Sequence, residues 1–363
     1  MKHLHSYLKL TTVALGVLVF SACKDDPKPT PEPTSASRIL MGAEGLEIGG
    51  TGTMNFYDPM QKVMERNIFQ KTNTYTMGNI LQSFLVDGDL TYLVLNGSAE
   101  IIVVKSDDFT FVRKIKGFGA PRQIMKVADN KFYVTDWQIE GIHVLNPSNG
   151  NIKKTLWTGL GPESMVLKDN IAIVANGGDG LIDSNLTFIN TDVDTVIDFI
   201  RAGNNPNSMQ LTEDNQLWVL CSGIADQNPS ASIPGELVSF NLDMDSIEYE
   251  IDSVNKVNAL TFSDNLMRPK QLKMGPDGQY LYFLDNVQDA NLMRYDTAMS
   301  FAPTSPYIAG SFYGLGVDLS RHEIYLSDDK DRIENGEVLR YDKDGGQIDV
   351  QTVGIIPSSF GFK

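Results

Sequence analysis

The chain has 363 residues, of which 42% are hydrophobic and 21% are charged, so it can bury a large core and does not have a disordered composition. Its formal net charge is −16, and a field of that sign repels phosphate backbones, which argues against nucleic acid as a partner. Cysteine occurs twice, at Cys23 and Cys221. Cys221 ends an apolar run that begins at Leu217, so we expect a buried thiol on a strand.

The first 22 residues have the pattern of a signal peptide. Lys2 and Lys9 precede an apolar stretch, Leu10 to Phe20, that is too short to span a bilayer. The sequence Phe20-Ser21-Ala22-Cys23 then resembles a bacterial lipobox, which implies cleavage before Cys23 and acylation of this cysteine, with palmitate among the added chains. The alternative is a plain secretory signal in which Cys23 is incidental.

The residues after Cys23 suggest where the protein is displayed. Lys24-Asp25-Asp26 resembles the surface-export signal of Bacteroidota lipoproteins, which implies anchoring in the outer membrane with the protein facing outward. Residues 27–37 are rich in proline and polar residues and should form an extended tether. We therefore expect a signal peptide at 1–22, an acylated cysteine and tether at 23–37, and one folded domain at 38–363.

A unit of four predicted strands recurs along this domain. Its second strand is strongly apolar, as in Thr91–Leu95 or Gln216–Leu220, and its third strand often ends in Asn or Asp, as at Asn190 and Asp342. Apart from one longer interval, the units begin every 40–45 residues, at Leu81, Pro121, Pro162, Pro206, Pro269 and Phe312. A four-stranded unit of this length is typical of a β-propeller blade.

The two ends of the domain complete one further blade. Pro357–Phe360 matches the first strand of the other units but has no unit after it. Residues 38–41, 53–58 and 63–70 supply the second, third and fourth strands. The sequence thus predicts an all-β, seven-bladed propeller, with six or eight blades as alternatives, that is closed by pairing of the C-terminal strand with the N-terminal blade.

Residues 38–363 resemble the YVTN-type (YncE-like) propellers. The resemblance rests on the apolar second strand, the polar loop and the third strand that ends in Asn or Asp, as in Leu186–Asn190. Lipid-anchored members of this class include surface propellers that capture cobalamin for an outer-membrane transporter. The resemblance implies such a role here, although the sequence contains no motif that specifies cobalamin.

The second position of each unit should ring one mouth of the central channel, because the first strand of each blade lines that channel. These residues are polar or amphipathic, and apolar residues follow two positions later; such convergence favours a ligand site. The alternative is a mouth that only holds water. The loop residue Trp137 offers a stacking surface, or packs under its own loop. The mouth residues are Gln82, Arg122, Glu163, Asn207, Lys270, Tyr313 and Ser358. The apolar residues are Phe84, Ile124, Met165, Met209, Leu272, Leu315 and Phe360.

Catalytic patterns are scarce. In the predicted mature chain, histidine occurs only at His143 and His322, which should lie far apart, so neither a triad nor a His-rich metal site is expected. Pairs such as Asp192 and Asp194 fall in turns, where aspartate bonds to the local backbone.

We therefore predict a non-enzymatic surface lipoprotein without catalytic residues, resident cofactor or metal. It would bind a ligand, with cobalamin as first candidate, through Arg122, Trp137, Glu163, Asn207, Lys270 and Tyr313, and would pass it to an outer-membrane transporter or other surface protein. The alternatives are a protein- or glycan-interaction scaffold and a carboxylate-dependent hydrolase or lyase.

Overall fold

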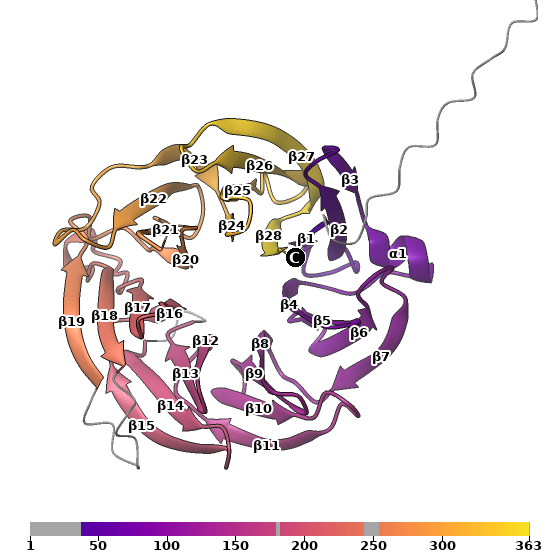
Figure 1. The fold of residues 1–363 in the computed structure, drawn as a ribbon, viewed down its shortest axis with the longest axis horizontal. Helices are drawn as coiled ribbons and strands as arrows, with labels where there is room; N and C mark the ends of the chain where they lie inside the picture. The colour runs from indigo at the N-terminus through magenta and orange to yellow at the C-terminus, as the bar shows by residue number, and fades with distance from the viewer. Residues whose placement is uncertain (1–37, 179–181, 243–253, 277, 363) are drawn as a thin grey trace, which may run out of the picture. The chain divides into compact units, whose positions relative to one another are not determined.

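The computed structural model describes residues 38–178, 182–242, 254–276 and 278–362. They form seven four-stranded antiparallel sheets arranged in a ring, which is a seven-bladed β-propeller (Figure 1). The predicted fold is therefore confirmed. The predicted signal peptide, Cys23 and the tether lie outside the described residues. Within the described residues, no helix is long and apolar enough to cross a membrane.

The innermost strand of each blade faces the centre of the ring, and each contacts the innermost strands of both neighbouring blades. The second strands are almost completely buried, because a neighbouring blade packs on each face of them, and this explains their apolar composition. The innermost strands are β28 (Pro357–Gly361), β4 (Leu81–Asp87), β8 (Pro121–Ala128), β12 (Pro162–Lys168), β16 (Pro206–Leu211), β20 (Lys270–Met274) and β24 (Gly314–Asp318). The second strands are β1 (Ile39–Ala43), β5 (Leu90–Leu95), β9 (Lys131–Asp136), β13 (Ile171–Asn176), β17 (Gln216–Cys221), β21 (Tyr280–Leu284) and β25 (Glu323–Asp328).

The third and fourth strands form the outer half of each blade. The third strands are β2 (Thr53–Asp58), β6 (Glu100–Lys105), β10 (Gly141–Leu145), β14 (Asn185–Asn190), β18 (Glu236–Leu242), β22 (Ala290–Asp296) and β26 (Asn335–Asp342). The fourth strands are β3 (Val63–Glu65), β7 (Phe111–Lys116), β11 (Ile152–Trp157), β15 (Thr195–Arg201), β19 (Val254–Thr261), β23 (Ile308–Phe312) and β27 (Gln347–Ile355). Two short helices occur in the described residues, α1 (Ile68–Asn73) and the 3-10 helix η2 (Pro229–Ala231).

Ring closure follows the prediction. The C-terminal strand β28 pairs antiparallel with β1, so that Met41 lies opposite Phe360, and β1 continues the sheet to β2 and β3 (Figure 1). One blade is thus built from both ends of the propeller. The apolar cores lie between neighbouring blades; Trp218, for example, is buried in the cluster that joins β17 and β18 to β21 and β22.

Two predicted boundaries are wrong. The strand predicted over residues 63–70 ends at Glu65, because Asn67 adopts the left-handed conformation (φ 54°) and α1 then buries Ile68 and Phe69. The sixth unit does not begin at Phe312. This residue ends the outer strand β23, where it is buried in the cluster shared with Leu315, and the inner strand starts at Gly314.

Candidate functional site

A cavity of about 1060 Å³ occupies the channel within the ring of innermost strands. It is lined by the whole set of predicted mouth residues, which we call the mouth ring (Gln82, Arg122, Glu163, Asn207, Lys270, Tyr313 and Ser358). Deeper in the channel it is lined by the predicted apolar residues, the apolar collar (Phe84, Ile124, Met165, Met209, Leu272, Leu315 and Phe360). All six predicted ligand-binding residues, including Trp137, therefore face one cavity.

Backbone irregularities at the start of the innermost strands bring successive residues to this wall. The pairing register shifts just after the first residue in β4, β8, β12, β16 and β20. A bulge of this kind interrupts the strict alternation of side chains, so that residues one position apart both reach the channel. A layer of short or amide side chains consequently separates the mouth ring from the apolar collar: Ser83, Gln123, Ser164, Ser208, Gln271 and Ser359.

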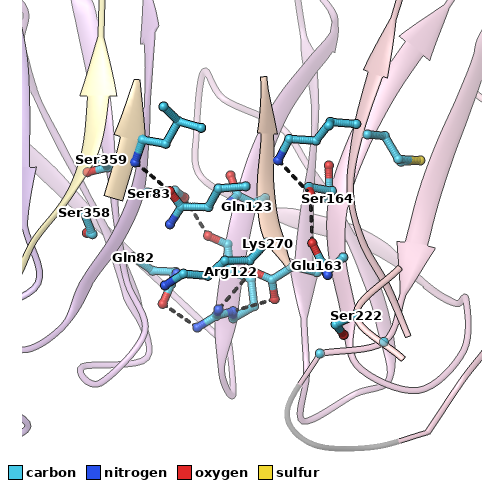
Figure 2. A pocket seen from close by; sticks show the side chains of 18 of the residues that line it. Gln82, Ser83, Arg122, Gln123, Glu163, Ser164, Ser222, Lys270, Ser358 and Ser359 are labelled. Carbon is cyan, nitrogen blue, oxygen red and sulfur yellow. Dashed lines mark hydrogen bonds and ion pairs between the residues drawn. The ribbon is translucent and has the colours of Figure 1, made fainter. Parts of the chain in front are cut away.

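One side of the mouth, which we call the Arg122 wall, is a connected set of side chains. The Arg122 guanidinium donates two hydrogen bonds to the Glu163 carboxylate, at 3.0 Å to Oε2 and 2.9 Å to Oε1, and a third to Oε1 of Gln82 (Figure 2). Both partners of this bidentate pair are largely buried. These hydrogen bonds link β4, β8 and β12 at the mouth. The Glu163 carboxylate neutralises the positive charge of Arg122 within the protein.

Trp137 supports Arg122. The guanidinium carbon lies 3.8 Å from the ring centroid, in cation–π contact. A Cβ at Gly178 would lie only 2.7 Å from Nε1 and Cζ2 of the indole, so glycine is needed there for the ring to fit. One face and the N–H edge of Trp137 are thus covered, and the ring braces the wall rather than standing free for a planar ligand.

The loop that carries Trp137 is fixed by Asp136. Its carboxylate accepts hydrogen bonds from the backbone N–H groups of Gly119 and Ala120 and lies 3.2 Å from Nε2 of His143. Burial alone would raise the pKa of Asp136, but these hydrogen bonds outweigh it and hold the pKa below its usual value. His143 is therefore a buried supporting residue of this loop.

The opposite side of the mouth, the Lys270 wall, is built differently. The Lys270 ammonium lies 3.9 Å from the centroid of the Tyr313 ring and donates to the carbonyl of Val287 at 2.7 Å. Tyr313 in turn donates its hydroxyl proton to Oε1 of Glu44 at 3.0 Å. Arg332 lies on the same ring, 4.8 Å from its centroid, and pairs with Asp329. Among the described residues, no carboxylate lies within ion-pair distance of Lys270.

Burial controls the ionisation of this wall. It lowers the pKa of Lys270 to about 8, although Glu44 and Asp329 act against the shift. It also raises the pKa of Glu44 and of Tyr313. Desolvated groups with perturbed pKa values in a cavity are typical of functional sites.

Sequence reasoning missed part of this wall. Glu44, Asp329 and Arg332 follow the second strands β1 and β25, in loops of the same kind as the loop that carries Trp137. This equivalent position in the repeat is the signal by which they could have been found.

Asn207 mainly links its own blade to the next one. Its side-chain N–H donates to the Pro269 carbonyl at 2.9 Å, and its Oδ1 accepts from Ser208. Ser83 and Gln271 make the same kind of bond to a carbonyl of the next blade. These bonds hold neighbouring innermost strands together around the channel.

The two histidines of the described residues lie in different blades. His143 lies on β10 and His322 in the turn before β25, as expected. Within the same residues, no three His, Cys, Asp or Glu side chains are grouped so that they would hold a metal ion. Cys221 is buried at the end of β17, as predicted.

These observations define a seven-bladed β-propeller with a large channel cavity, polar at its mouth and apolar below. The chain belongs to the family described as "Domain of unknown function (DUF5074)", whose model matches residues 40–343. No curated protein matches the chain.

Solved structures share the fold. A quinonprotein alcohol dehydrogenase-like protein from Bacteroides thetaiotaomicron has 14% identity and a TM-score of 0.66, over 90% of this chain and 78% of that one. A putative 6-phosphogluconolactonase from Bacteroides uniformis has 9% identity and a TM-score of 0.66, over 90% and 100%. A second, from Bacteroides fragilis, has 10% identity and a TM-score of 0.64, over 92% and 100%. At these identities the likeness concerns the fold alone.

Proposed function

We propose that this propeller is a non-catalytic protein that holds a small molecule in the channel cavity. The observation that carries the proposal is the convergence of the mouth ring and the apolar collar, which come from seven separate blades, on one cavity of about 1060 Å³. Ligand sites are concave, mostly apolar, and carry a few polar groups that fix orientation; 300–1,000 Å³ is typical. This cavity is concave and is lined by polar and apolar groups in about equal measure, and its volume lies near the upper end of that range.

The anchored location belongs to the same proposal and rests on the sequence of residues 1–37. The direction of β1 shows on which face the chain enters the propeller. Ala43, at the end of β1, lies opposite Pro357 beside the mouth, whereas Leu40 pairs with Gly361 at the far end of β28. The chain therefore enters the propeller at Arg38 on the face opposite the mouth.

The rim of the mouth favours a partner that covers it. Exposed aliphatic side chains occur on several loops that join second to third strands, and on the loop before β20. Exposed apolar side chains that surround an opening favour an interaction site. These rim residues are Ile48, Ile182, Ile233, Leu266, Val287 and Ile333. They support a receiving protein that docks over the cavity, and they equally favour the alternative of an interaction scaffold.

Calorimetry of a chain beginning at Ser35, which contains all seven blades, tests the ligand directly with cyanocobalamin as probe. Submicromolar one-to-one binding that weakens at least tenfold in Tyr313→Ala supports the proposal. Absence of heat at several temperatures removes cobalamin as the ligand. If the protein then co-purifies with a membrane protein and loses it in Ile333→Asp, the scaffold alternative takes precedence.

A further inference from the structure

Lys273 is a second cation of the cavity that sequence reasoning did not identify. It lies on β20, three residues beyond Lys270, and lines the channel below the mouth ring. At about 3.3 Å per strand residue, it lies roughly 10 Å deeper than Lys270. Leu272 of the apolar collar precedes it on the same strand. The cavity thus contains a lysine at the mouth and another near the collar.

Lys273 is not neutralised within the described part of the chain. It has neither a carboxylate at ion-pair distance nor a hydrogen-bond acceptor there, and burial alone lowers its pKa. Buried charges in proteins are normally paired, because an unpaired ammonium loses its hydration without compensation. Lys273 is partly buried at the channel wall, so its ammonium is only partly hydrated, and it is available to an anion that enters the channel.

Two other cations of the cavity lining have protein partners. Arg122 is matched by Glu163, and Arg268 donates at 2.7–2.9 Å to the carbonyls of Ile224, Asn265 and Met267. The described charged residues of the lining are four cations (Arg122, Arg268, Lys270 and Lys273) and two carboxylates (Glu44 and Glu163). The cavity lining therefore carries an excess of positive charge inside a chain whose net charge is −16.

We propose that the cavity selects an amphipathic anion, with its carboxylate or phosphate group bound by Lys273 and its apolar body against the apolar collar. This inference rests on the proposed function and adds the class of ligand. Lys270 provides a second cation at the mouth, where it attracts the anion as it enters. The negative field of the remaining surface does not favour anions, so selectivity arises within the channel.

Three matched probes test the proposal by calorimetry: 1-naphthoate, 1-naphthyl phosphate and the neutral 1-naphthalenemethanol. They share an apolar body and differ in charge. We expect one or both anions to bind at least tenfold more tightly than the alcohol, and the better one identifies the acid group. Lys273→Met should reduce anion affinity at least tenfold and leave the weak binding of the alcohol unchanged, while Lys273→Arg should retain most of the affinity.

Lys126→Met is the matched control, because Lys126 also lies on an innermost strand, β8, but pairs with Asp87 outside the cavity. It should bind all probes as the unmodified chain does. Thermal unfolding separates a binding role from a structural one: Lys273→Met should be as stable as the unmodified chain or more so. This inference is overturned if the alcohol binds as tightly as the anions, or if Lys273→Met keeps full affinity for the anions. In either case the proposed ligand-binding function of the cavity still stands. No binding of any probe overturns the proposed function as well.

Discussion

The Arg122 wall and the Lys270 wall face each other across one mouth but balance their charges in different ways. Arg122 has a bidentate carboxylate partner and an amide, which neighbouring blades supply, and an aromatic ring from its own blade. Lys270 has a carbonyl and an aromatic ring, and its carboxylate neighbours act only at longer range. A cation with a full set of protein partners holds the ring together, whereas a cation with incomplete partners is available to a ligand.

The largest effect should come from breaking the Arg122 wall. Glu163→Ala leaves the Arg122 guanidinium largely buried without its partner, and we expect a loss of about 3 kcal/mol in the free energy of unfolding. Urea denaturation measures it. Lys343→Ala, which removes an exposed pair with Asp344, is the control and should leave the free energy of unfolding nearly unchanged. A similar small loss in Glu163→Ala would show that this wall does not depend on the pair.

The pKa of Lys270, in the Lys270 wall, should distinguish this residue from ordinary surface lysines. Because burial lowers its pKa to about 8, its amine should reach half-maximal reactivity with an acylating reagent near pH 8. Lys343, whose pKa is raised by hydrogen bonding to Asp344, should titrate above the usual value of about 10.5. Mass spectrometry of peptides labelled at a series of pH values gives both midpoints. Coincident midpoints would contradict the difference between the walls.

Anion binding should follow the same titration. An anion stabilises the ammonium form, so affinity for 1-naphthyl phosphate should be highest below pH 8 and fall by up to about tenfold per pH unit above it. The charged and titratable groups around Lys270 are Glu44, Tyr313, Asp329 and Arg332. Calorimetry between pH 7 and 9.5 measures the decline, which should become shallower in Lys270→Met. A pH-independent affinity would show that this lysine does not take part.

The smallest effect should come from Tyr313→Phe. The variant keeps the ring beneath Lys270 but removes the hydrogen bond to Glu44, which should cost about 1 kcal/mol of stability. Since that bond lowers the pKa of Glu44, its loss should raise this pKa further. Urea denaturation and NMR titration of the Glu44 side chain measure the two changes. Tyr313→Leu, which also removes the ring, should in addition move the Lys270 midpoint.

Sequence periodicity was sufficient for the parts of the molecule that repeat. The seven blades, the closure by β28 and the placement of the mouth ring follow from one unit and its spacing, because every blade uses the same strand order. Departures from the unit were not predictable in this way. Phe312 looked like a unit start because it precedes an apolar run, yet its ring is needed between two blades. The helix α1 replaced a predicted strand because it buries Ile68 and Phe69.

Contacts between blades were beyond the same reasoning. The bidentate pair of Arg122 with Glu163 and the hydrogen bond from Tyr313 to Glu44 each join residues of different blades. The lack of a partner for Lys273 likewise depends on what neighbouring blades place around it. Their positions follow from the bulges and loop conformations of individual blades. The residue types at the mouth were therefore predictable, but their pairing was not.

The pairing of β1 with β28 also sets the order in which the molecule can be completed. Leu40 and Gly361 are more than 300 residues apart in the chain, so β1, the first of the described strands, waits for β28, the last of them. Six blades consist of consecutive segments and can form as the polypeptide emerges, while β1, β2 and β3 remain without an inner neighbour. Contacts of such long sequence separation slow folding. Until β28 has been synthesised, the channel wall lacks one innermost strand, so a ligand that needs the whole wall is captured only after β28 is in place.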